Sequence, residues 1–169
     1  MALSITATYN NKSSFTLTET NAGESASLTD SKNLSSSYTY GSGDNQVTNG
    51  VSITGVLPSG GTVEFDLQSI SQTTFGSSQN INFSGVKHFS VYNDSTTEGY
   101  DFTVTATGTN AFTNIFNGGS GNLVVKPYSS FSYNDVYTGT VVTASNKAFE
   151  LNDQGSGVNY KILILDLDK

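Results

Sequence analysis

The 169-residue sequence has no cysteine, no tryptophan and no arginine, and it contains only two prolines. Without cysteine, the chain can form no disulfide bond and offers neither a thiolate nucleophile nor a sulfur ligand for zinc. Arginine is the side chain that most often grips phosphate or guanine through two parallel hydrogen bonds. Its absence and the net charge of -7 argue against binding to nucleic acid or to an anionic membrane surface.

Charged residues make up only 12% of the chain, and the strong helix formers are thin throughout. Ser, Thr, Asn and Gly dominate, and Tyr, Phe and Val recur in every segment. Thr, Val, Tyr and Phe favour strands, whereas Ser, Asn and Gly favour turns. The composition therefore predicts a single all-β domain over residues 1–169. No apolar run is long enough for a membrane span, and the N-terminus lacks the layout of a signal peptide.

The most apolar segment is the run from Gly157 to Leu167. In an extended strand, alternate side chains point to opposite faces. One face of this run carries Val158, Tyr160, Ile162 and Ile164, and the other carries Leu163, Leu165 and Leu167. A strand that is apolar on both faces must be covered on both. We therefore expect a central strand covered by loops or a second layer, or one whose second face meets another chain.

Shorter alternating segments recur along the chain between Gly-, Asn- and Ser-rich turns. The clearest are 63–67, 86–93 and 100–106, and the last of these predicts a strand with one wet face. Roughly ten to twelve strands at even spacing are typical of an antiparallel two-sheet sandwich of jelly-roll-like form. We expect helix only in short turns near 68–76 and 110–117.

The N-terminal part has a different pattern. Alternation over residues 3–9 predicts a strand that ends in a turn at Asn10-Asn11-Lys12, and a second strand follows around Phe15 and Leu17. Residues 21–50 are polar and weakly patterned, which predicts a loop-rich stretch. We therefore expect residues 1–20 to form an arm or edge hairpin that meets a partner. The candidate interface residues are Leu3, Ile5, Tyr9, Phe15, Leu163, Leu165 and Leu167.

No residue pattern predicts catalysis. His88 is the only histidine, so a Ser-His-Asp triad would depend on it, and its place inside a strand predicts a half-exposed structural residue. Glu64 with Asp66 and Asp166 with Asp168 are carboxylate pairs, which we interpret as a solvated strand face and a frayed acidic tail. The sequence therefore predicts no catalytic residue, no cofactor and no metal ligand.

Two kinds of binding site stay open. Asp44-Asn45, Asn93-Asp94 and Asn152-Asp153 lie at expected turns, where oxygen ligands could converge on calcium, although turn formation alone explains these residues. Exposed tyrosines can stack on sugars. The candidates for such a platform are Tyr9, Tyr38, Tyr40, Tyr92, Tyr128, Tyr133 and Tyr137. We expect most of them to fill the core instead.

A series of short motifs follows in order from residue 38 to residue 165. The main ones are Tyr40-Gly41-Ser42-Gly43-Asp44-Asn45-Gln46, Glu64-Phe65-Asp66-Leu67, Phe83-Ser84-Gly85-Val86-Lys87, Val125-Lys126-Pro127-Tyr128-Ser129-Ser130-Phe131 and Val158-Asn159-Tyr160-Lys161-Ile162-Leu163-Ile164. This order resembles a widespread set of small virion proteins of tailed bacteriophages. The chain departs from their pattern with Tyr128 and Ser129, where glycines are common, and with Leu165-Asp166 in place of a closing glycine.

The resemblance implies a non-enzymatic structural protein of the virion with a jelly-roll or sandwich fold. It implies head decoration, in which a cement protein binds the lattice of the major capsid protein and stabilises the shell. A homo-oligomer is expected, with a trimer as one option, on the capsid exterior after synthesis in the host cytoplasm. The alternative is a phage fibre component or a glycan-binding, lectin-like module.

Overall fold

The computed structural model describes residues 6–21, 24–40, 43–74, 77–106, 108–116, 122–135 and 137–166. For residues 6–21, 24–37, 39, 40, 72–74, 77 and 79, only the backbone is described. The described residues form fourteen strands and one short 3₁₀ helix, so the predicted all-β class is confirmed. The elements are β1 (Thr6–Asn21), β2 (Glu24–Tyr40), β3 (Gln46–Val47), β4 (Asn49–Leu57), β5 (Thr62–Asp66), β6 (Ile70–Thr74), β7 (Ser77–Ile81), β8 (Gly85–Asn93), β9 (Phe102–Thr105), η1 (Asn114–Phe116), β10 (Asn122–Val125), β11 (Ser130–Asn134), β12 (Thr140–Val141), β13 (Ala148–Asp153) and β14 (Val158–Asp166).

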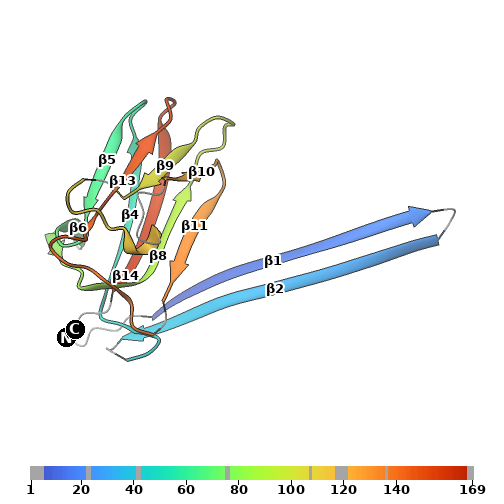
Figure 1. Cartoon of the computed structure of the whole chain (residues 1–169), viewed down its shortest axis with the longest axis horizontal. Helices are drawn as coiled ribbons and strands as arrows, with labels where there is room; N and C mark the ends of the chain where they lie inside the picture. The colour runs from blue at the N-terminus through green and yellow to red at the C-terminus, as the bar shows by residue number, and fades with distance from the viewer. Residues whose placement is uncertain are drawn as a thin grey trace.

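Two antiparallel sheets pack face to face as a sandwich (Figure 1). One has the strand order β10-β9-β13-β5, and the other has the order β11-β8-β14-β4, with β12 paired to β8. Aromatic rings fill the space between the sheets. The Phe149 ring stacks on Phe65 at 5.0 Å between centroids and meets the edge of Phe89 at 5.1 Å. Such ring pairs add about 0.5–1.5 kcal/mol beyond the area that they bury.

The C-terminal strand β14 occupies the centre of its sheet, as predicted, between β4 and β8. Its inner face, formed by Val158, Tyr160, Ile162 and Ile164, is buried in the main core. On its second face, Leu165 is 5% exposed and packs with Tyr38 and Val47 in a separate small cluster. The chain itself therefore covers the second face of this strand at its C-terminal end.

The N-terminal strands form one long ribbon that projects from the sandwich (Figure 1). β1 and β2 pair antiparallel from Thr6↔Thr39 to Asn21↔Glu24. The predicted turn at Asn10-Asn11-Lys12 is wrong, because these residues lie inside β1. The prediction of a loop-rich 21–50 is also wrong, because β2 runs through residues 24–40. A ribbon that stands away from the core can be solvated on both faces, so polar residues in mid-strand cost little desolvation there.

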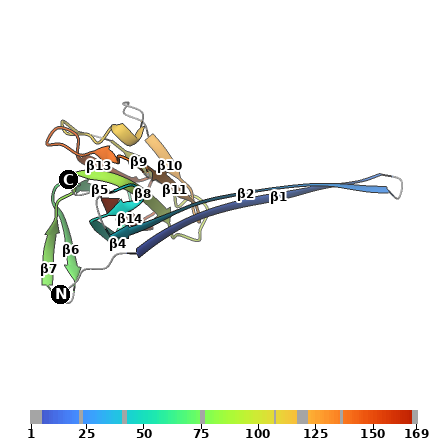
Figure 2. The same cartoon turned by 90° about the horizontal axis from the view of Figure 1, so that it is seen from below.

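Two further expectations concern helical turns. The turn expected near 110–117 is confirmed as the 3₁₀ helix η1. The turn expected near 68–76 is wrong, because β6 pairs there with β7 in a separate two-stranded ribbon, which stands beside the sandwich in Figure 2. Ser and Gln fill β6 and β7, so apolar alternation could not identify these strands.

Candidate functional site

The most prominent feature for function is the β1–β2 ribbon, residues 6–40, which we call the arm. With 16 residues in β1 and about 3.4 Å per residue, it is about 50 Å long. Figures 1 and 2 both show its far end standing clear of the sandwich. An isolated two-stranded hairpin is only marginally stable in water. An arm of this length therefore becomes more stable when it packs against another protein surface.

The register divides the positions of the arm into two different faces. Each odd-numbered residue of β1 pairs with an even-numbered residue of β2, as in Leu17↔Leu28. Because paired residues point to the same side of a sheet, these positions share one face. We call it the apolar face, and its apolar positions are Ala7, Tyr9, Phe15, Leu17, Ala26, Leu28, Leu34, Tyr38 and Tyr40. The opposite face, which we call the hydroxyl face, carries only Ser, Thr and Asn apart from Lys12. The apolar face also holds polar positions, four of them charged: Glu19, Glu24, Asp30 and Lys32. The apolar positions of the arm therefore share one face by register but do not form an unbroken apolar stripe.

The edges of the arm are open within the described part of the chain. There β1 pairs with β2 alone, and β2 pairs with β3 only at Thr39 and Tyr40. Exposed edges invite pairing with another chain, and proteins usually blunt them with proline, bulges or many charges. The arm has no proline, and its register with β2 is continuous. Its edges are thus suited to strand addition by a partner.

The apolar face of the arm continues into the sandwich at Tyr38, which is fully buried. The Tyr38 hydroxyl donates to Asn134 Oδ1 over 3.2 Å and to the Lys87 carbonyl over 3.4 Å. Together with Val47 and Leu165, these contacts form what we call the junction. It fixes the base of the arm against β14.

His88 belongs to the same region and is 1% exposed, so the prediction of a half-exposed histidine is wrong. Its Nδ1 lies 2.6 Å from Asn134 Oδ1, the oxygen that also accepts from Tyr38. Burial lowers the pKa of His88, although the hydrogen bond that Asn134 Oδ1 accepts from the imidazole opposes the shift. Burial also lowers the pKa of Lys87, against the attraction of Asp44 and Asp135. The ammonium of Lys87 donates to the Gly43 carbonyl over 2.8 Å.

The carboxylates have structural roles. Asp166 is fully buried, and its two oxygens accept from the backbone amides of Gly85 at 2.7 Å and Ser84 at 3.2 Å. The prediction of a frayed acidic tail is therefore wrong for Asp166, while Asp168 lies outside the described residues. Glu64 is exposed, as expected for a solvated strand face, and Asp66 forms an ion pair with Lys147 at 2.6 Å.

The candidate interface residues fall into separate groups. Leu3, Ile5 and Leu167 lie outside the described residues. Tyr9 and Phe15 hold positions on the apolar face of the arm. Leu163 is half-buried beside the junction. Leu165 is 5% exposed and packs against Tyr38 of its own chain.

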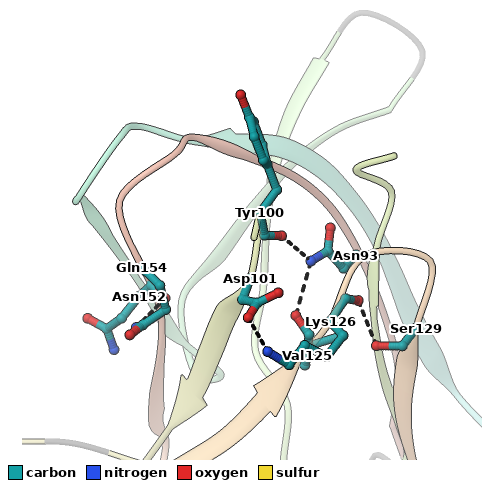
Figure 3. A network of polar contacts seen from close by, with 8 residues as sticks. All are labelled: Asn93, Tyr100, Asp101, Val125, Lys126, Ser129, Asn152 and Gln154. Atoms are coloured by element: carbon teal, nitrogen blue, oxygen red, sulfur yellow. Dashed lines mark hydrogen bonds and ion pairs between the residues drawn. The ribbon is translucent and has the colours of Figure 1, made fainter. Parts of the chain in front are cut away.

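A second feature is a pocket of about 500 Å³ at the opposite end of the sandwich, which we call the distal pocket. It is lined by loop residues Thr96, Glu98, Gly99, Asp101, Lys126, Pro127 and Tyr128. Lys126 Nζ forms an ion pair with Asp101 Oδ2, drawn in Figure 3. Asp101 Oδ1 is buried and has no hydrogen-bond partner among the described residues.

Tyr128 has an unusual backbone in this pocket. Its φ is 55°, a left-handed conformation that favours glycine and is a genuine outlier for a bulky residue. Its side chain is 63% exposed. Sequence reasoning named Tyr128 as a possible sugar platform but gave no binding role to Asp101, Lys126 or Glu98. The signal that could have found the site was the tyrosine at a turn position where glycine is usual.

Asn93 holds the loops of the distal pocket together (Figure 3). It is fully buried, and its Nδ2 donates to the carbonyls of Tyr100 at 2.7 Å and Val125 at 3.0 Å. Its Oδ1 accepts from the amide of Ser95 at 3.0 Å. One side chain therefore satisfies three backbone groups on both walls of the pocket and fixes its shape.

Asp153 plays a similar part beside these loops and is 7% exposed. Its Oδ2 accepts from the amides of Gly60 at 2.7 Å and of Gly155 and Gly157, both at 3.0 Å. Burial would raise the pKa of this carboxyl, but the backbone donors outweigh burial and hold it below its ordinary value. Among the described residues, no three His, Cys, Asp or Glu side chains group closely enough to hold a metal ion.

The tyrosines differ in exposure. Tyr38 and Tyr160 are buried, Tyr92 and Tyr133 are half-buried, and Tyr128 and Tyr137 are exposed. Only the last two could therefore serve as open platforms among the tyrosines whose side chains the structure describes. No helix in the described part is both long and apolar enough to cross a membrane.

Comparisons with known proteins identify no family. No family model matches the chain, and no curated protein matches it. A solved structure, "Crystal structure of Yersinia pseudotuberculosis-derived mitogen (YPM)", is similar at 16% sequence identity and a TM-score of 0.35. The similarity covers 72% of this chain and 88% of that chain.

Proposed function

We propose that this protein is a non-catalytic attachment protein. The arm binds the subunits of a larger protein lattice, and the sandwich stays exposed on the surface of that lattice. The observation that carries this proposal is the arm. Its apolar positions share one face by register, its edges are open over most of their length, and it is about 50 Å long. Such an element gains little from its own sandwich beyond the junction. Its length and open edges suit a protein partner that supplies a long groove or a strand edge.

The resemblance to tailed-phage virion proteins suggests the identity of the lattice. We propose that the partner is the major capsid protein and that this protein is a capsid decoration protein on the virion exterior. A regular array of identical sites suits an arm that repeats one contact in every copy. A homo-oligomer, with a trimer as one option, would let the open edges of neighbouring arms pair with each other.

The rival function, a fibre or glycan-binding module, is supported by a different observation, the exposed Tyr128 in the distal pocket. The two functions use opposite ends of the molecule. They are compatible in one protein, and they predict different locations and copy numbers on a particle.

A cosedimentation experiment tests the arm. The chain is mixed with capsids of the phage that carries it, after the native copies have been removed. Replacing Phe15, Leu17 and Leu28 by Ala truncates the apolar face, and we expect binding to weaken at least about tenfold. The matched control replaces Thr16, Thr18 and Thr29 by Ala on the hydroxyl face at neighbouring positions.

A second variant shortens the arm without changing any residue of the sandwich. Residues 12–33 are removed and Asn11 is joined to Leu34 through an Asn-Gly turn, which suits a tight hairpin. This deletion follows the register and leaves Tyr38 in the junction. We expect an unchanged circular dichroism spectrum and no capsid binding. Full binding by this shortened chain would refute the role of the arm.

A further inference from the structure

The distal pocket lies at the end of the sandwich opposite the arm. β8 begins at Gly85, whose amide is held by Asp166 near the junction, and it ends at Asn93 under the pocket. Its 9 residues span about 30 Å. A sandwich that is attached through its arm would therefore present this pocket away from the attachment surface. This arrangement favours a ligand that arrives from outside.

We propose that the distal pocket binds a neutral saccharide, with the ring of Tyr128 as its stacking platform. An exposed aromatic ring next to polar groups matches the two sides of a sugar, an apolar C–H face and a rim of hydroxyls. The left-handed backbone of Tyr128 adds weight to this assignment. Strained conformations of bulky residues concentrate at ligand sites, because glycine would serve better if only the turn mattered.

The pocket also offers polar groups that sugar hydroxyls can bond. The Lys126 side chain lines the pocket and is 68% exposed, so its ammonium can donate to a sugar hydroxyl. Thr96 and Glu98 line the rim and offer further hydrogen bonds to neighbouring hydroxyls.

The charges of the pocket select against acidic sugars. Glu98 and Asp101 bring two carboxylates, and Lys126 brings one ammonium, which already pairs with Asp101. The local field is therefore negative, in a chain whose net charge is -7. A sialylated or uronic-acid ligand would meet repulsion there, so the ligand class is a neutral saccharide.

The walls of the pocket are fixed before a ligand arrives. Asn93 bonds both loops, the amide of Tyr128 donates to the Asn93 carbonyl over 3.1 Å, and the amide of Ser129 donates to the Lys126 carbonyl over 3.1 Å. A pre-formed site loses less conformational entropy on binding. This inference does not depend on capsid attachment, because the isolated chain is sufficient to test it.

The test uses the full chain on a printed array of neutral and sialylated glycans, followed by calorimetric titration with the best-bound neutral oligosaccharide. We expect binding to neutral glycans, and a loss of roughly tenfold or more for Tyr128→Ala and for Lys126→Ala. Tyr128→Phe keeps the ring and is expected to bind within about threefold of the parent. Tyr137→Ala is the matched control, because Tyr137 is equally exposed and does not line the pocket.

Tyr128→Gly separates a binding role from a structural one. Glycine relieves the left-handed backbone, so this variant should fold at least as stably as the parent and yet fail to bind glycan. Three results would overturn the proposal: no neutral glycan bound on the array, binding confined to sialylated glycans, or unchanged affinity in Tyr128→Gly. Capsid attachment through the arm would stand in each of these cases.

Discussion

At the residue scale, the stability of the sandwich depends on a few buried polar side chains that clamp backbone amides. Asp153 holds three glycine amides in two adjoining turns, and Asp166 holds the chain just before β8. A hydrogen bond to a charged group contributes about 1.5–3 kcal/mol. These carboxylates therefore stabilise turns that the glycine-rich sequence alone would leave loose.

The Asp153 clamp gives a pH-dependent prediction. Its folded pKa lies below the ordinary value, so it stabilises the fold above the unfolded pKa, and that contribution is lost as the pH falls through the folded pKa. We expect Asp153→Asn to lower the free energy of unfolding by about 1–3 kcal/mol at neutral pH. Urea titrations at neutral pH and at about pH 3 measure the difference, which should shrink in acid.

Asp94→Asn serves as the control for that comparison. The side chain of Asp94 is 41% exposed and forms a surface ion pair with Lys161. Such exposed pairs contribute about 0–1 kcal/mol. An Asp153→Asn effect as small as this control at neutral pH would mean that the clamp is not stabilising.

The carboxylates also show what sequence could not predict. No sequence pattern at Asp166 separates a solvated tail from a buried clamp, because its partners Ser84 and Gly85 are 82 and 81 residues away. His88 was misjudged for a similar reason. Its strand was predicted correctly, but its burial depends on Tyr38 and the arm, which the local alternation of residues 86–93 does not reveal.

At the element scale, β14 and the arm mark the two limits of sequence-based prediction. The inner face of β14 is apolar throughout and its second face becomes apolar only from Leu163 onward, so alternation predicted its central place but not which residues cover the second face. The arm is a strand pair rich in Ser, Thr and Asn, residues that also make turns. Only the pairing of β1 with β2 in the structure shows how long the arm is. The distal pocket was likewise hidden, because its residues come from loops whose approach depends on the whole sheet.

The junction between arm and sandwich should respond to acid. The His88 pKa is lowered in the folded state, so the unfolded chain binds the extra proton first. Stability therefore falls as the pH drops below about 6.5, the unfolded value, until the folded pKa is reached. Lys87 beside it also has a lowered pKa, but it titrates from a value of 10.5 and lies outside this window.

Replacing His88 by Gln tests this expectation, because glutamine stays neutral in the same range. We expect the stability of the parent to decline as the pH falls below about 6.5, and that of His88→Gln to change less. Hydrogen exchange at β2 near Tyr38 would show whether the base of the arm loosens along with it. Parallel pH profiles for the two proteins would count against a role for His88.

At the scale of the whole molecule, the two candidate surfaces lie at opposite ends of the sandwich. The arm leaves beside the C-terminal end of β14, and the distal pocket lies beyond its N-terminal end (Figures 1 and 3). A molecule of this form can attach through one end and bind a ligand with the other. The long β8 and β14 strands connect the two ends rigidly through their shared register.

Cryo-electron microscopy of the particle that carries this protein tests the central claim most directly. The account predicts many copies at regular positions on the outer capsid surface, with the apolar face of each arm lying along capsid subunits and the distal pocket facing solvent. Copies confined to the tail tip, or arms that extend into solvent without a protein partner, would contradict it.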